Sequence, residues 1–157
     1  MMLASACRAG RLAVERLDRI PHDLIALVAR FGVAGVFWQS ARTKVEGLTI
    51  TDTTYLLFRE EYRIPLLPAE LAAVAATVSE HLFAVLLVIG LATRFSAAAL
   101  LGMTLVIQIF VYPLAWPTHL TWAASFLYLI ARGGGRFALD AVLTKPYVMP
   151  KASAAAD

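Results

Sequence analysis

The segment "AELAAVAATVSEHLFAVLLVIGLA" (Ala69–Ala92) decides the fold, because it is almost wholly apolar over a length that suits a lipid bilayer. A helix that spans a membrane needs about 20 mostly apolar residues, and this segment provides them. Glu80 and His81 interrupt it near its middle. The segment therefore predicts a membrane-spanning helix that carries an ionisable group near the centre of the bilayer.

Three further apolar segments have the same character, and composition supports a membrane protein. Hydrophobic residues make up 60% of the chain and charged residues 16%, against roughly 45–50% and 25% in soluble domains. We predict an all-α membrane protein, a four-transmembrane-helix bundle with a short amphipathic helix in its outer loop. The expected spans are about 24–41, 69–92, 95–115 and 117–131, the last being short, within a membrane domain at 24–140. Residues 1–23 form a cytoplasmic N-terminal segment and residues 141–157 a flexible C-terminal tail.

The distribution of Lys and Arg predicts the orientation. One side of the membrane would hold nine basic residues, in the N-terminal segment, the link between spans two and three, and the C-terminal segment: Arg8, Arg11, Arg16, Arg19, Arg94, Arg132, Arg136, Lys145 and Lys151. The other side would hold four: Arg42, Lys44, Arg59 and Arg63. The positive-inside rule then places both termini in the cytoplasm. We expect a multi-pass protein of a bacterial-type inner membrane, with no cleaved signal. No basic stripe with interleaved aromatic residues is present, so a nucleic-acid partner is not expected.

The outer loop, 43–68, mixes apolar and charged residues. Asp52 is expected to cap a helix that starts at Thr53, and Tyr55, Phe58 and Tyr62 then share one face. This helix lies on the outer membrane surface or caps the bundle, and Pro65 and Pro68 end the element. Polar residues around the loop form a candidate outer-face site: Gln39, Lys44, Glu60, Glu61 and Tyr62.

The polar residues within the spans form a candidate intramembrane site. At about 1.5 Å per residue, Glu80 lies about 18 Å and Gln108 about 20 Å from the inner end of their spans, so the two share a level. Arg30 lies nearer the cytoplasm, and its contact with Glu80 requires a tilt or a register that closes the gap. His81 is about 100° around the helix from Glu80 and points elsewhere. The first three spans are expected to meet around Glu80, with Arg30, Gln108 and His81 nearby.

Two roles for Glu80 stay open from the residues alone. A charge at the bilayer centre costs roughly 2.5–3.5 kcal/mol on insertion scales, so the carboxylate pairs with a donor or stays protonated. One role is a proton relay or a quinone hydrogen-bond partner, and the other is a polar clamp that orients helices. We expect no catalytic residue and no metal ligand, since the histidines match neither haem nor HExxH spacing and no nucleotide-binding or nucleophile motif occurs.

Four stretches resemble the DoxX family of small four-span membrane proteins. They are "RFGVAGVFWQSARTKVEG", "LFREEYRIPLLP", "SEHLFAVLLVIGLATR" and "MTLVIQIFVYPLAWPTHLTWAA", within about 30–140. The family pattern maps onto Arg30, Gly35, Lys44, Gly47, Glu61, Tyr62, Pro65, Glu80, Gly90 and Arg94. The family is named for a small subunit of a quinol-linked oxidase complex, and other members look like partners of soluble redox or stress-response proteins.

The resemblance implies an accessory subunit of a quinone-linked redox or stress-response pathway. A quinone is then the expected ligand, with no covalently bound cofactor. The expected partners are the lipid bilayer, a redox or stress-response protein, and a second copy of the chain. Two other functions stay open. One is a non-catalytic scaffold with a structural polar core, and the other is a small proton-coupled transporter lined by Arg30, Glu80 and Gln108, for which no inverted repeat is visible.

Overall fold

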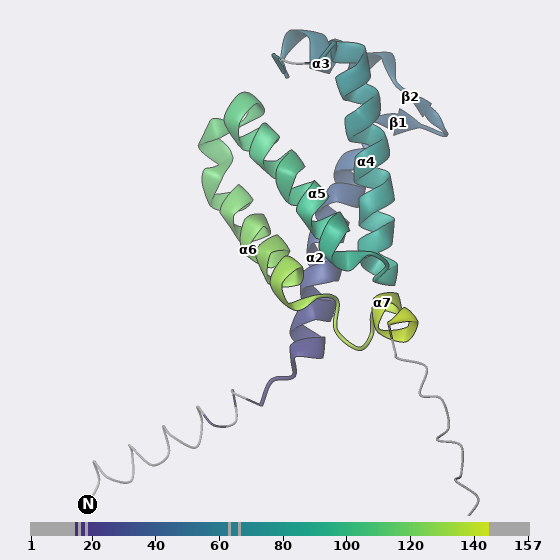
Figure 1. Cartoon of the computed structure of the whole chain (residues 1–157). Coiled ribbons are helices and arrows are strands. Elements are labelled where there is room, and N and C mark those ends of the chain that lie inside the picture. Colours follow the sequence, from purple (N-terminus) through teal and green to yellow (C-terminus); the bar gives the residue numbers. More distant parts are fainter. Residues whose placement is uncertain (1–14, 16, 18, 63, 66, 145–157) are drawn as a thin grey trace, which may run out of the picture.

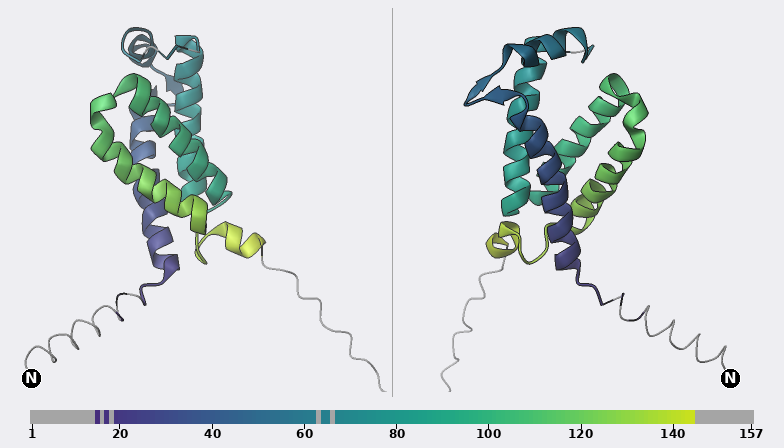
Figure 2. Two further views of the ribbon diagram at one scale, coloured as in Figure 1. Left: turned by 60° about the vertical axis from the view of Figure 1, so that its left-hand side comes forward. Right: turned by 180° about the vertical axis from the view of Figure 1, so that it is seen from behind.

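The computed structural model describes residues 15, 17, 19–62, 64–65 and 67–144. Its frame is four long helices, namely α2 (His22–Arg42), α4 (Ala69–Ile89), α5 (Thr93–Val106) and α6 (Trp116–Arg132). Helix α2 packs on α4, and α5 packs on α6. The two pairs lie close together where α4 turns into α5 and separate toward the end that carries α3 (Figures 1 and 2).

The helical class is confirmed, and three of the predicted spans coincide with helices of suitable length and composition. Among the described residues, three helices are long and apolar enough to cross a membrane: His22–Arg42, Ala69–Ile89 and Thr93–Val111. The fourth long helix, α6, has 17 residues. The short helix α7 (Leu139–Leu143) extends into the first residues of the predicted C-terminal tail. Residues 145–157 and most of the predicted N-terminal segment lie outside the described residues.

Glycines end two of the long helices. Gly90 follows α4 in the left-handed conformation, with φ of 72°. A Cβ at this position would lie 2.6 Å from the Cα of Ala138, so the site requires glycine for space as well as for conformation. Gly133, with φ of 79°, follows α6. The glycine run at 133–135 therefore acts as a helix stop and turn.

The outer end of α5 is not a regular α-helix. A π-helical turn (η1, Ile107–Val111) follows Val106, and a 3₁₀ turn (η2, Pro113–Ala115) follows Tyr112. The helix of the third expected span therefore continues through the π turn to Val111 and does not run regularly to Ala115. Proline at 113 has no amide hydrogen to continue the helical ladder, and π turns accommodate one additional residue in a helix.

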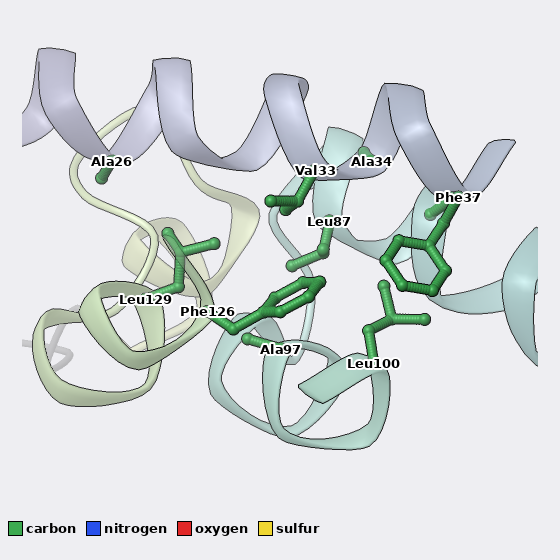
Figure 3. Close-up of a cluster of buried hydrophobic side chains, with 10 residues drawn as sticks. Ala26, Val33, Ala34, Phe37, Leu87, Ala97, Leu100, Phe126 and Leu129 are labelled. Atoms are coloured by element: carbon green, nitrogen blue, oxygen red, sulfur yellow. The ribbon is translucent and has the colours of Figure 1, made fainter. Parts of the chain in front are cut away.

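Small residues let the four helices approach closely around two aromatic rings. Phe37 of α2 and Phe126 of α6 are buried, with ring centroids 5.7 Å apart. Figure 3 shows them between α2 and the other three helices. The rest of the buried cluster is Ala26, Val33, Ala34, Ala84, Leu87, Ala97, Leu100 and Leu129. Alanines at such positions permit close backbone contact in membrane bundles.

The outer loop folds into a hairpin and a helix. Strand β1 (Val45–Glu46) pairs antiparallel with β2 (Thr49–Ile50), and Gly47 adopts φ of 62° in the turn between them. This hairpin was not predicted. Strand β2 leads into α3 (Asp52–Glu60).

Helix α3 differs from its prediction at both ends. Thr51 caps it by accepting a hydrogen bond from the amide of Thr54 at 3.3 Å, so Asp52 is the first helical residue rather than the cap. The helix ends at Glu60, before either proline, and Pro68 instead precedes α4. Phe58 is buried against Ala72 and Ala73 of α4, so α3 caps the outer end of that helix.

Candidate functional site

A cavity of about 170 Å³ lies between the two helix pairs, near the end where they separate. All four long helices and α3 contribute to its wall. The wall is mostly apolar or aromatic and is formed by Val36, Phe37, Ser40, Lys44, Phe58, Tyr62, Ile64, Ala76, Glu80, Met103, Val106, Ile107, Val111, Tyr112, His119 and Trp122. The first three predicted spans therefore meet around Glu80, as expected.

A buried ion pair forms the polar part of the wall. The Nζ of Lys44 lies 2.8 Å from Oε2 of Glu80, and the two residues are only 8% and 2% exposed. Lys44 also donates to the hydroxyl of Ser40 at 2.8 Å and to the carbonyl of Ser40 at 3.1 Å. The Ser40 hydroxyl in turn donates to Oε1 of Glu80 at 3.3 Å. The carboxylate thus has both a cation and a hydroxyl donor in a water-poor site.

This pair joins one residue from each predicted site. Lys44 follows the last turn of α2, and its chain reaches back to Glu80 in the middle of α4. A lysine side chain is long enough to place its ammonium group several ångströms from its own Cα. Estimates of membrane depth that use Cα positions alone therefore place Lys44 and Glu80 at different levels, although their charged atoms are in contact.

Neither tilt nor register closes the gap between Arg30 and Glu80, and Arg30 bonds to other partners. Its guanidinium is 1% exposed and donates to the carbonyls of Leu87 at 2.7 Å, Val88 at 2.6 Å and Gly134 at 3.1 Å. Leu87 and Val88 lie in the last turn of α4, where the helix dipole favours a positive charge. Arg30 therefore fixes the inner end of the bundle.

Gln108 pairs with a residue that sequence reasoning left out of the site. Its amide nitrogen donates to the carbonyl of Pro113 at 2.7 Å, and its Oε1 lies 2.6 Å from Nδ1 of His119. His119 is 6% exposed and lines the cavity. The sequence feature that could have identified His119 is its position at the end of the proline-rich segment "YPLAWPTH". Gln108 does not contact Glu80, since its side-chain amide is bonded to Pro113 and His119 instead.

His81 and Gln39 are not part of the cavity wall. The Nδ1 of His81 lies 2.8 Å from the carbonyl of Thr77, and its ring packs edge-on against Trp38 at 5.3 Å. Gln39 is exposed on α2. His81 therefore points elsewhere than Glu80, as helix geometry indicates.

A hydrogen-bonded group beside the cavity, which we call the tyrosine latch, consists of Glu61, Tyr62 and Tyr112, and both tyrosines line the cavity. The Tyr112 hydroxyl donates to Oε1 of Glu61 at 2.9 Å and lies 3.0 Å from the Tyr62 hydroxyl. The latch joins the end of α3 to the end of η1. The hydrogen bond with Tyr62, burial and the Glu61 carboxylate all raise the pKa of the Tyr112 phenol. Glu60, the remaining member of the predicted outer-face site, is exposed on α3.

A second polar cluster holds α7 against the start of α5. Both carboxylate oxygens of Asp140 accept hydrogen bonds at the start of α5, from the amides of Ala92 at 2.7 Å and Thr93 at 2.8 Å. Burial alone would raise the pKa of Asp140, but these hydrogen bonds outweigh it and lower the pKa below its usual range. Arg136 likewise donates to Asp23 at 2.7 Å, which joins the turn between α6 and α7 to the start of α2.

Comparisons with known proteins identify the family of the chain. The sequence model of the DoxX family matches residues 25–113, which run from within α2 to the first residue of η2. An uncharacterised protein from Haemophilus influenzae is 28% identical over 145 residues, covering 84% of this chain and 91% of that protein. No solved structure matches.

Proposed function

This chain belongs to the DoxX family, and we propose that it is an accessory membrane subunit of a quinone-linked redox or stress-response pathway. In this proposal the cavity holds the quinone ring, while a partner protein carries out electron transfer. The family match and the cavity beside the Lys44–Glu80 pair support it.

The cavity is the observation that carries the proposal. Ligand sites are usually concave and mostly apolar, with a few well-placed polar groups. Phe37, Met103 and Trp122 supply an apolar and aromatic surface suited to a flat ring, and the wall also carries the polar groups of Lys44, beside α4, and His119, on α6. A quinone has this chemistry, since its ring is apolar on both faces and its oxygen atoms lie at its edge.

The proposal also places the protein in the inner membrane with four crossings and cytoplasmic termini. The excess of Lys and Arg outside the 43–68 loop supports this orientation. The 17 residues of α6 reach about 26 Å at about 1.5 Å each. That length is a few ångströms short of the hydrocarbon core, a mismatch that a locally thinner bilayer accommodates.

A binding assay with a matched pair of variants tests the proposal. Ala76 lines the cavity, whereas Ala75, its neighbour on α4, is exposed on the outer face of the helix. Purified protein in native-lipid nanodiscs is titrated with decyl-ubiquinone, and quenching of tryptophan fluorescence is followed. We expect saturable binding by the parent and by Ala75→Phe, and none by Ala76→Phe.

Co-purification provides the second arm of this test. The proposal expects endogenous quinone, or a redox or stress-response protein, to remain with the chain in native-lipid preparations. Absence of both, together with no saturable quenching by the parent protein, would refute the proposed function.

A non-catalytic scaffold is the second candidate function, and one observation favours it. All three N–H groups of the Lys44 ammonium are already used, by the Ser40 carbonyl, the Ser40 hydroxyl and Glu80. A pair satisfied in this way serves as a clamp between α2 and α4 without a ligand. The scaffold function expects Glu80→Gln to retain both the fold and the cellular phenotype.

A further inference from the structure

The hydrogen-bond donors in the cavity wall are almost all in use. The Lys44 ammonium has three N–H groups, and each has an acceptor within 3.1 Å. The Ser40 hydroxyl donates to Glu80. Tyr112 donates to the carboxylate of Glu61, so its oxygen accepts the hydrogen of Tyr62. A ligand that offers only acceptors therefore finds few donors here.

Gln108 fixes which nitrogen of His119 carries the hydrogen. A backbone carbonyl only accepts, so the Gln108 amide nitrogen must be the atom that faces Pro113. The Gln108 oxygen then faces Nδ1 of His119 and requires a hydrogen there. In the neutral imidazole, Nε2 is consequently an acceptor. Nε2 has no hydrogen-bond partner among the residues that the structure describes.

Trp122 supplies the remaining donor beside this acceptor. Its indole N–H has no hydrogen-bond partner within the described part of the chain, and its ring centroid lies 5.1 Å from that of His119. Both residues line the cavity. An aromatic hydroxyl both donates and accepts, so one such group placed between these neighbouring rings can donate to His119 and accept from Trp122. A quinone carbonyl accepts from Trp122 and leaves the His119 acceptor unsatisfied.

We propose that the cavity selects a ring that bears a hydroxyl group, the hydroquinone form or a phenol, over the oxidised quinone, and that His119 determines this preference. Gln108 is a positioning residue that holds His119 in the required tautomer. The inference rests on the proposed function, since it names the form of the ring that the same cavity binds, and it concerns binding alone.

Paired titrations of the full chain test the preference. The probes are decyl-ubiquinone and its hydroquinone, the latter kept reduced under anaerobic conditions, in nanodiscs of fixed lipid composition. We expect the hydroquinone to bind about tenfold more tightly, because the quinone leaves a buried acceptor without a partner. Equal affinities, or tighter binding of the quinone, would overturn this inference and leave the proposed function intact, whereas binding of neither form would overturn both.

Variants separate the roles of the two residues. His119→Phe should abolish the preference while retaining binding of the quinone. Trp122→Phe should weaken both forms equally and retain the preference, because both forms accept from the indole N–H. His81→Phe is the matched control, since it makes the same exchange outside the cavity. If His119→Phe still binds the hydroquinone more tightly than the quinone, the assignment to His119 is contradicted. If that variant fails to fold, the ratio of hydroquinone to quinone affinity in the parent protein decides.

Discussion

Lys44 and Glu80, 36 residues apart in the sequence, form an ion pair with 2.8 Å between Nζ and Oε2, almost fully shielded from solvent. The pair joins the segment after α2 to the middle of α4 and forms one side of the cavity. It is therefore both a structural clamp and a part of the candidate binding site, and the two roles respond differently to mutation.

Removing one partner of this pair should strongly destabilise the bundle. Glu80→Leu leaves the Lys44 ammonium buried without a counter-charge, for which we expect a loss of about 3–5 kcal/mol in the free energy of unfolding. Glu80→Gln retains a hydrogen-bond acceptor and should cost less. The double variant Lys44→Met/Glu80→Leu should recover most of the loss, because no unpaired charge remains. Unfolding in detergent, followed by circular dichroism, measures these differences.

An exposed ion pair provides the control for this experiment. Arg59 and Glu70 are 2.8 Å apart, but their side chains are more than half exposed. Exposed pairs contribute little, so Glu70→Gln should leave the melting temperature unchanged. Equal melting of the parent and of Glu80→Leu would show that the buried pair stabilises nothing.

The tyrosine latch should control the mobility of α3. Tyr112→Phe removes the hydrogen bond to Glu61 and the acceptor of Tyr62, so amides in α3 should exchange roughly fivefold faster with deuterium. Because the pKa of Tyr112 is raised in the folded state, the protonated phenol contributes its full stabilisation of the folded state below the usual phenol pKa of about 10. This contribution is lost only as the pH rises above that value. Tyr128→Phe, which breaks a hydrogen bond to His22 elsewhere, should leave exchange in α3 unchanged.

Asp140 should make the stability of the inner end depend on pH. Its folded-state pKa is lowered, so its contribution is complete above the unfolded pKa of about 3.9 and is lost as pH falls through the folded pKa. At neutral pH, Asp140→Ala should cost about 1 kcal/mol, as for loss of a helix cap. The difference between parent and variant should disappear in strong acid. A difference that stays constant from pH 7 to pH 2 would exclude a role for the ionised carboxylate.

Chemical labelling should establish the orientation. Leu48 is fully exposed in the turn of the hairpin, and Cys7 is the single cysteine of the chain. In intact cells, a membrane-impermeant maleimide should label a Cys7→Ser/Leu48→Cys variant. The parent, with Cys7 alone, should be labelled only after the cells are permeabilised. The reverse pattern would place the termini outside.

Hydrophobic length and pattern predicted most of the helical frame. The segment around Ala84 is apolar on every face and long enough to cross a bilayer as a helix, so the helix at 69–89 follows from length and composition alone. The hairpin at 45–50 was missed because two-residue strands carry almost no periodic signal, and only Gly47 indicates a turn. The interruption of α5 at 107 was missed because its apolar residues are compatible with either a regular or a π-helical turn.

The site was only partly predictable, because side-chain reach decides it. Glu80 was identified from its position in an apolar run, but its partner was sought at the same depth. Lys44 and Arg30 both direct long side chains away from the level of their own Cα atoms, toward Glu80 and toward the end of α4 respectively. His119 becomes part of the site only through the fold of the link between α5 and α6, which sequence spacing does not specify.

The π turn at Ile107–Val111 has a consequence for comparing this chain with its relatives. Such a turn contains one residue more than the regular helix needs, so a relative that is one residue shorter here retains an intact helix. In that relative, the residues before and after the gap keep the faces that they have here, because the wider turn is what absorbs the extra residue. A one-residue gap at this point would therefore mark relatives that have a regular helix in place of the π turn and can still carry the latch tyrosine on the same face.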